Sequence, residues 1–226
     1  MIDDIVILLA GFIAVVVVLT LHEFSHAFVA YKCGDPTAKF AGRMTLNPTK
    51  HFDPMGLFFF VFAHFGWAKP VPINPYNFKN QKWGTFWTSI AGILVNYLSA
   101  FLVFYPLRLL TVEYVLPIFA GKYMALFLYM LTELLYAYSI SFAVFNFLPI
   151  YPLDGFRICE TFCGNRSKEL NYLRSNGSYI LMGLIVINIL SQYLPILKVI
   201  NVLGIAMEQL GGWLSSPIIA FWGLIF

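Results

Sequence analysis

Charged residues are scarce in this sequence, and their scarcity decides the class of protein. Only 11% of the 226 residues are charged, whereas 60% are hydrophobic and 18% are aromatic. Soluble domains carry about 25% charged residues, so this composition excludes an ordinary soluble domain and predicts a chain that crosses a membrane several times. The formal net charge of +3 is small and spread over loops, so we expect no nucleic-acid partner.

Cysteine pairs and a basic N-terminal stretch are also missing. The three cysteines, Cys33, Cys159 and Cys163, form no C-x-x-C motif, which argues against a disulfide framework. A secretory signal begins with basic residues, but this chain begins with Asp3 and Asp4. We therefore expect the first apolar run to be retained as a membrane span.

Long apolar runs predict an all-α polytopic membrane protein. A spanning helix needs about 20 mainly apolar residues. The runs that reach or approach this length cover residues 3–32, 83–107, 123–148, 178–194 and 199–226. The shorter run 57–67 suits a re-entrant segment, which gives about five to six membrane segments. We expect a single domain over 1–226, with core motifs at about 10–160 and C-terminal membrane helices at about 178–226.

The stretch after the first span is too polar and too short to cross a membrane. Ala38–Leu46 has Gly42 and Arg43 at its centre, which predicts a small β-hairpin or strand. An exposed strand edge can pair with an extended peptide, so we expect this segment to hold a substrate chain.

Two histidines and a glutamate lie near the end of the first apolar run. No charged side chain occurs between Ile5 and Leu21, and the sequence HEFSH follows at 22–26. Helix residues four apart share a face, so His22 and His26 can bind one metal ion, with Glu23 in reach of a water on it. An ionisable group at membrane depth costs about 2.5–3.5 kcal/mol, and a bound metal ion would offset that cost. This pattern is typical of a hydrolytic zinc site.

The distribution of basic residues predicts the topology. Lysine and arginine number 4 in residues 32–53, 3 in 69–82, 2 in 108–122 and 4 in 155–175. The positive-inside rule then places the first, second and fourth of these loops in the cytoplasm. The first two can share a side only if the segment between them enters the membrane and returns.

A third ligand must come from elsewhere, because catalytic zinc keeps three protein ligands and one open position. Asp154 directly follows a helix end that is broken by prolines on the cytoplasmic side, and we favour it over its alternative role as a helix cap. Glu133, within the third span, is a rival. His51 and His64 are weaker rivals, for which we favour loop and interface roles.

These motifs resemble those of the site-2 protease family, which are intramembrane zinc metalloproteases, in its compact form without a PDZ domain. The first is HExxH at 22–26. The second, NxxPxxxLDG at 146–155, resembles the family motif whose aspartate is the third zinc ligand. Residues 91–96 match the G-x-x-x-N element of the middle core helix, although Ile93 stands where the family commonly has proline.

The resemblance implies an activity and a role for each site residue. Glu23 would be the catalytic base, and Asn146 would contact the substrate backbone. Gly92 and Asn96 would help to shape the substrate groove. The implied ligands of one Zn²⁺ per chain are His22, His26 and Asp154.

The implied substrate is a membrane protein with a transmembrane segment, such as a membrane-anchored regulatory protein. The implied location is the cell membrane, with the active site toward the cytoplasm. The alternative function is a membrane metal-ion transporter that uses the same histidine and aspartate ligands. A transport path needs polar residues through both leaflets, and the outer half offers little beyond Glu133. The sequence leaves the oligomeric state open.

Overall fold

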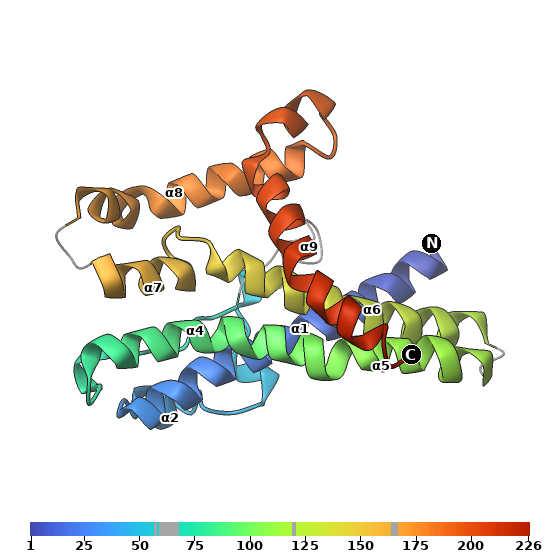
Figure 1. Ribbon diagram of the computed structural model, residues 1–226, viewed down its shortest axis with the longest axis horizontal. Coiled ribbons are helices and arrows are strands. Elements are labelled where there is room, and N and C mark those ends of the chain that lie inside the picture. The colour runs from blue at the N-terminus through green and yellow to red at the C-terminus, as the bar shows by residue number, and fades with distance from the viewer. Residues whose placement is uncertain (57, 59–67, 119–120, 164–166) are drawn as a thin grey trace.

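Three long helices packed against one another form the centre of the molecule. The computed structural model describes residues 1–56, 58, 68–118, 121–163 and 167–226, and all structural statements concern these residues. Helices α1 (Ile2–Cys33), α4 (Gln81–Ser99) and α6 (Lys122–Phe147) are in mutual contact and run along the long axis of the molecule (Figure 1). Each buries one face against the other two, as an all-α architecture requires.

Four helices of the described chain are long and apolar enough to cross a membrane. They are Ile2–Cys33, a continuous helical stretch Gln81–Ile118, Lys122–Phe147 and α8 (Lys168–Leu190). The predicted all-α polytopic fold is therefore confirmed at this level. The last predicted segment forms α9 (Val202–Trp222), which is not among the four.

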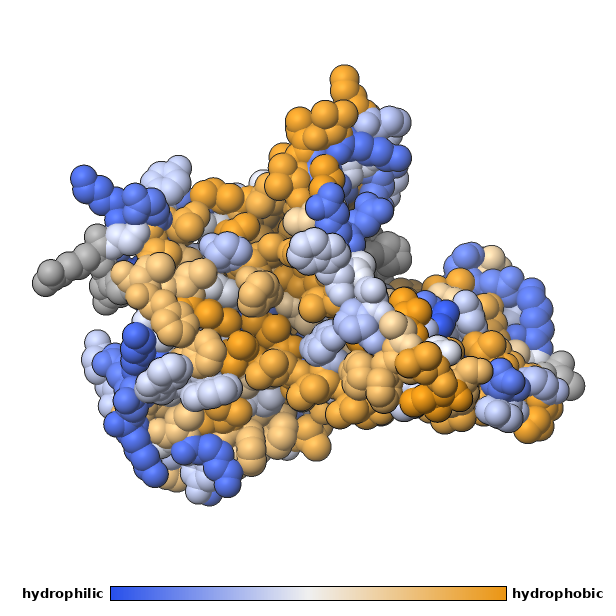
Figure 2. All heavy atoms as spheres, in the orientation of Figure 1, coloured by the Kyte–Doolittle hydropathy of each residue, from blue (hydrophilic) through white to orange (hydrophobic). Residues whose placement is uncertain are grey.

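The apolar surface agrees with a membrane setting. Hydrophobic residues cover the middle of the face shown in Figure 2, and hydrophilic residues gather toward its two ends, while the tip between α8 and α9 has both kinds. Large hydrophobic side chains are exposed along the candidate spans, and hydrocarbon rather than water is the solvent that makes such exposure favourable.

The end of α1 is fixed by a glycine in the left-handed conformation. Gly34 has φ 113°, which costs a residue with a Cβ but not glycine. Its amide donates to the Tyr31 carbonyl at 3.1 Å, and the Asp35 amide donates to the Ala30 carbonyl at 2.9 Å. The chain thus leaves α1 sharply, and the loop that follows folds back beside the helix end.

The core between these helices is closed by α9. Buried residues of α1, α6 and the turns after α4 form one cluster, Tyr97 of α4 packs against it, and Ile218 of α9 is fully buried in it. The helical stretch after α4 contains a π-helical turn, Ala100–Phe104, in which the Tyr105 amide donates to the Ala100 carbonyl. In this register the next amide would serve the Phe101 carbonyl, but residue 106 is proline and has no N–H. The Trp222 indole donates to that carbonyl instead, at 2.7 Å.

The predicted hairpin or strand at Ala38–Leu46 is wrong. Residues Thr37–Phe40 form a single helical turn, α2, and turns follow it. Its amides bond locally: Ala41 N–H donates to the Thr37 carbonyl at 3.0 Å, and Arg43 N–H to the Ala38 carbonyl at 2.8 Å. Backbone amides already paired within the turn cannot form a strand ladder, so residues 40–43 offer no donors to a substrate strand.

The flanks of the predicted re-entrant run meet each other. Phe52 and Ala68 form an antiparallel bridge, and the Lys69 amide donates to the His51 carbonyl at 2.9 Å. The chain therefore leaves and returns at the same end of the bundle, as the predicted topology requires. Apart from Phe58, the run 57–67 itself lies outside the described residues.

Candidate metal centre

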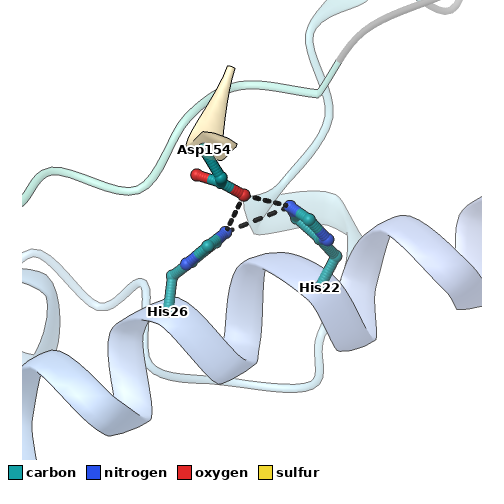
Figure 3. A group of neighbouring side chains, drawn as sticks. All are labelled: His22, His26 and Asp154. Atoms are coloured by element: carbon teal, nitrogen blue, oxygen red, sulfur yellow. Dashed lines mark hydrogen bonds and ion pairs between the residues drawn. The ribbon is translucent and has the colours of Figure 1, made fainter. Parts of the chain in front are cut away.

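Two helices bring three ligand atoms to one point. His22 and His26 lie one turn apart on α1 and are 4% and 5% exposed. Asp154 is the first residue of α7 (Asp154–Cys163). Its Oδ2 lies 3.2 Å from His22 Nε2 and 3.1 Å from His26 Nε2, and the two nitrogens are 3.0 Å apart (Figure 3). The structure thus brings together the three residues that the sequence named as metal ligands.

The position of Asp154 depends on the end of α6. That helix stops at Phe147, before the two prolines of the following turn, and α7 begins directly beside the stop. A Cβ built on Gly155 would lie 2.2 Å from the Phe147 carbonyl oxygen and 2.5 Å from that of Leu148. Only glycine therefore lets the start of α7 pack this closely, which explains the L-D-G sequence physically.

The hydrogen bonds behind the histidines decide which nitrogens face the centre. His26 Nδ1 lies 2.7 Å from the Thr88 carbonyl oxygen, which can only accept, so Nδ1 carries the proton and Nε2 offers a lone pair. His22 Nδ1 lies 3.1 Å from Asn96 Nδ2. When His22 Nε2 acts as a ligand, Nδ1 carries the proton, so the Asn96 amide must be turned by 180° to present its oxygen to it.

Three lone-pair atoms then meet with no proton between them. Two neutral imidazoles and a carboxylate oxygen in this arrangement repel one another unless a cation lies among them. The ligands of tetrahedral zinc, each about 2.0–2.1 Å from the ion, are separated by about 3.3 Å, close to the spacing here. The site fits Zn²⁺.

Helix α4 lines the back of the centre with one face. Thr88, Gly92 and Asn96 are spaced four apart, so they share a face of the helix. A Cβ on Gly92 would lie 2.4 Å from His22 Cε1 and 2.6 Å from both ring nitrogens. Gly92 and Asn96, which the resemblance assigns to the substrate groove, thus contact a metal ligand directly in this structure; their contact with substrate stays a prediction.

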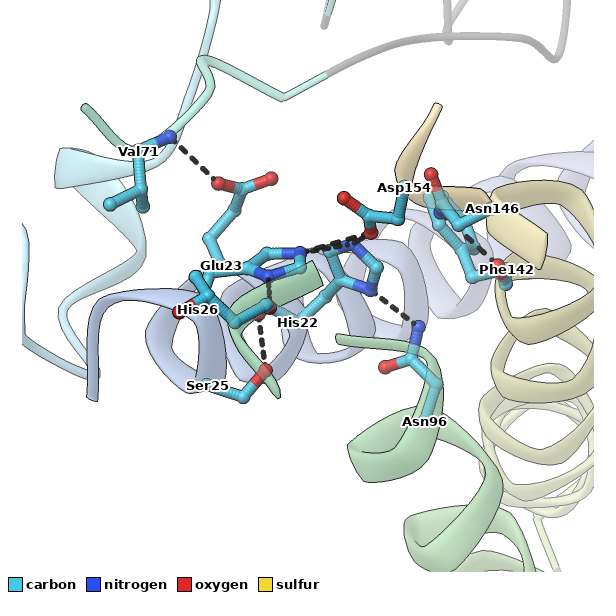
Figure 4. Close-up of polar contacts among 10 residues, drawn as sticks. His22, Glu23, Ser25, His26, Val71, Asn96, Phe142, Asn146 and Asp154 are labelled. Carbon is cyan, nitrogen blue, oxygen red and sulfur yellow. Dashed lines mark hydrogen bonds and ion pairs between the residues drawn. The ribbon is translucent and has the colours of Figure 1, made fainter. Parts of the chain in front are cut away.

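Glu23 lies beside the three ligands but outside the cluster that they form. Its Oε2 accepts a hydrogen bond from the Val71 backbone amide at 3.0 Å. The other carboxylate oxygen points toward the side on which Asp154 lies (Figure 4). One oxygen is therefore held by the protein, and the other is directed toward the centre.

Asn146 lies near the end of α6, and in the view of Figure 4 its side chain is drawn beside Asp154. Its side-chain amide donates to the Phe142 carbonyl at 3.1 Å. The side-chain oxygen is left for another donor, so this residue can reach a second backbone without losing its own anchor.

The rival ligands lie elsewhere or outside the described residues. Glu133 forms an ion pair with Arg108, away from the three-residue cluster. His51 is fully buried and its Nε2 lies 2.8 Å from the Thr45 carbonyl oxygen, a loop role as predicted. His64 lies outside the described residues.

Two groups that form hydrogen bonds with site residues were not predicted from the sequence. The Thr88 carbonyl and the Val71 amide are backbone groups, and every residue type has them. The four-residue spacing of Thr88, Gly92 and Asn96 could have placed Thr88 on the same face of α4 as the other two.

Comparison with known proteins identifies the same chemistry. The model of peptidase family M50 matches residues 106–190. YwhC of Bacillus subtilis, named as a zinc metalloprotease, is 42% identical over 150 residues, which is 66% of this chain and 66% of that protein. Rip2 of Mycobacterium tuberculosis, also named as a zinc metalloprotease, is 33% identical over 161 residues, which is 69% of this chain and 56% of Rip2. No solved structure matches at a significant level.

The family match covers residues 106–190, which contain Asn146 and Asp154, whereas the histidines come from the first helix. The fold joins these two parts of the chain in one buried cluster of the composition that zinc hydrolases use. Taken with its relatives, the chain belongs to peptidase family M50, a family of zinc metalloproteases.

Proposed function

We propose that this protein hydrolyses peptide bonds within or beside transmembrane segments of membrane-anchored regulatory proteins. The observation that supports this best is the depth of the ligands in α1. The helix has 32 residues, about 48 Å, and His22 lies about 30 Å from its start. The hydrocarbon core of a bilayer is about 30 Å thick. A centred helix therefore holds His22 inside that layer, nearer to its loop end.

The ligands would hold zinc by His22 Nε2, His26 Nε2 and Asp154 Oδ2. When bound, zinc supplies Lewis-acid activation of water and of the peptide carbonyl. The Thr88 carbonyl keeps His26 in the tautomer that leaves Nε2 free, and Asn96 would do the same for His22 with its amide oxygen turned to Nδ1.

Glu23 is the general base. Its Oε2 is fixed by the Val71 amide, so its other oxygen is the one available to accept a proton from the attacking water. The same carboxyl can then donate that proton to the leaving amine. Asn146, at the end of α6, can support the developing charge through the second N–H of its side-chain amide, or accept from a neighbouring peptide N–H through its oxygen.

The substrate must become extended before this chemistry can occur. In a helix, every interior carbonyl is hydrogen-bonded and covered by side chains, and a freed backbone group in hydrocarbon costs several kcal/mol unless it is paired. We therefore expect helix-weakening glycine or asparagine in a substrate span to speed cleavage, and leucine at the same positions to slow it.

We further propose that the centre opens toward the cytoplasm. The basic residues concentrate in the loops at the end of the bundle where α1 stops and α4 begins. His22 and His26 lie toward that end of α1, and Asp154 follows the end of α6 at the same centre, which supports a reaction in the cytoplasmic half of the bilayer.

The decisive experiment separates zinc binding from proteolysis. Purified protein in liposomes is assayed with a tagged single-span substrate, and zinc is counted by mass spectrometry. Glu23→Gln should retain zinc and lose cleavage, because only the base is removed. His22→Ala and Asp154→Ala should lose both.

A matched substrate tests the intramembrane part of the proposal. The same cleavage sequence is presented within a membrane span and within a soluble peptide. Preference for the embedded form supports the proposal, whereas efficient cleavage of the soluble peptide alone would leave a metalloprotease that acts outside the membrane. Near-wild-type cleavage by Glu23→Gln would overturn the general-base assignment.

A further inference from the structure

The segment Lys69–Asn74 holds the catalytic base from outside the metal cluster. It runs extended beside α1, without helix or sheet. Val71, buried within it, donates its amide to Glu23 across 48 positions of sequence. A single backbone donor thus sets where one carboxylate oxygen lies, and the accuracy of that contact depends on what holds the segment.

Two prolines make the segment stiff and poor in donors. Pro70 and Pro72 stand on either side of Val71, and each has a fixed φ and no N–H. Of the four residues inside the segment, only Val71 and Ile73 therefore retain an amide hydrogen. The chain can neither slide by one residue and still offer a donor to Glu23, nor fold locally into a helix.

One anchor lies two residues before Val71. Lys69 donates its amide to the His51 carbonyl at 2.9 Å, and its own carbonyl accepts from Arg43 Nη2 at 2.6 Å. Arg43 is 7% exposed and His51 is fully buried. Both main-chain groups of Lys69 are thus held by buried residues of the loop that follows α1.

The other anchor lies three residues after Val71. Asp35 is fully buried, and its Oδ2 accepts from the Asn74 amide at 2.7 Å. Its Oδ1 accepts from Asn77 Nδ2 at 2.8 Å and from the Thr37 amide at 3.1 Å. A buried carboxylate with this many donors is rigid, because losing any of them would leave charge unsolvated.

We infer that Asp35 and Arg43 are positioning residues for the catalytic base. Together they fix both ends of Lys69–Asn74, so that the Val71 amide holds one oxygen of Glu23 and leaves the other directed at the centre. This inference rests on the proposed role of Glu23. Asp35 lies two residues after α1, the helix that contains the two histidine ligands. The same end of α1 therefore determines the position of the metal ligands and that of the catalytic base.

The first test removes one anchor and compares it with a matched control. Asp35→Ala frees the Asn74 end of the segment. Asp53→Ala is the control, because Asp53 also lies in the loop after α1 and caps the Met55 and Gly56 amides, but makes no bond to Lys69–Asn74. Asp35→Ala should lower kcat about 10- to 100-fold with zinc content and KM unchanged, since misplacing a catalytic group by about 1 Å costs up to about 100-fold. The control should stay within about twofold.

A double-variant cycle separates positioning from general stability. If Asp35 acts through Glu23, Asp35→Ala should cost nothing further in the Glu23→Gln background, where the base is already absent. An equal loss of residual rate in both backgrounds would mean that Asp35 only supports the fold, and would overturn the inference. If Glu23→Gln lost cleavage while Asp35→Ala cleaved at the wild-type rate, the inference would be overturned but the proposed function would stand.

A second pair of variants decides the matter if Asp35→Ala fails to bind zinc. Val71→Pro removes the donor to Glu23 at a position already between prolines. Ile73→Pro is the matched control, because it removes the other amide hydrogen inside the segment and leaves the Val71 amide in place. Val71→Pro should lower kcat about 10- to 100-fold with zinc retained, and Ile73→Pro should lower it much less. Equal rates for these two variants would show that the Val71 amide does not position the base.

Discussion

Gly92 leaves room for a metal ligand, and adding one methyl group there should displace it. A Cβ at this position would lie 2.4 Å from His22 Cε1, whereas ordinary contacts are 3.4–4 Å. The ring must therefore move by about 1 Å, or α4 must move away from α1 by a similar distance. Metal–ligand distances tolerate only about 0.2 Å, so a shift of this size takes His22 Nε2 out of coordination range.

The loss in zinc affinity can be estimated from the effect of smaller changes around metal ligands. Disturbing an outer hydrogen-bond partner of a ligand typically costs 10- to 100-fold in metal affinity, about 1.4–2.8 kcal/mol. Gly92→Ala moves the ligand itself, so we expect a loss at or above the upper end of that range. Alanine is a better helix former than glycine by about 0.8–1.0 kcal/mol, so a loss of affinity cannot be ascribed to weakened helix propensity.

Chelator competition on purified protein measures the affinity, and circular dichroism reports whether the helices are intact. Gly183→Ala is the matched control, because Gly183 lies inside α8 and a Cβ there would have no neighbour within 4 Å. The control should bind zinc as wild type does. If Gly92→Ala bound zinc within about twofold of wild type, the close packing of α4 on His22 would be refuted.

Three other outcomes are expected. Asn96→Ala removes the partner of a ligand histidine and should weaken zinc binding about 10- to 100-fold, measured in the same chelator assay. Single cysteines placed at Lys50 and Lys79 in a cysteine-free background should be labelled from the same side of the membrane, and opposite accessibility would contradict the predicted topology. Burial raises the pKa of Asp35, but the hydrogen bonds that it accepts outweigh burial and hold this pKa below the ordinary value. The contribution of Asp35 to loop stability is therefore complete above about pH 4, and it is lost as the pH falls through the lowered pKa of the folded protein. Limited proteolysis of the loop across pH 2–6 should show this acid sensitivity in the wild type, and Asp35→Asn should abolish it.

Helix positions were predictable where apolar periodicity and length agreed. The runs at 3–32 and 123–148 correspond to α1 and α6 within one residue at each end. The second span was predicted to stop before Arg108, but the helical stretch continues to Ile118. Arg108 pairs with Glu133 of α6, so the charge that signals a helix end in sequence is neutralised by a partner that only the fold reveals.

The candidate ligands were also predictable, whereas their supports were not. Residue type and four-residue spacing identify His22 and His26, and a proline-broken helix end identifies Asp154. The contacts that orient them are made by backbone groups, such as the Thr88 carbonyl beside His26, or by side chains that become neighbours only in the fold. The wrong strand at Ala38–Leu46 has the same origin, because a short polar stretch can satisfy its amides within itself and the sequence does not show which pairing wins.

The hydrogen bond from Trp222 to the Phe101 carbonyl has a consequence for biosynthesis. The chain emerges from the ribosome in order, so the span with the π-helical turn enters the membrane long before α9 is made. Until Trp222 arrives, a carbonyl that proline has deprived of its helical donor lacks the partner found in the folded protein, at a cost of several kcal/mol in hydrocarbon. The spans that are synthesised first can therefore be inserted before all their backbone groups are hydrogen-bonded, and docking of α9 supplies the missing bond. Tags or truncations that disturb residues 218–222 should consequently destabilise the helix around Phe101, more than 100 positions upstream.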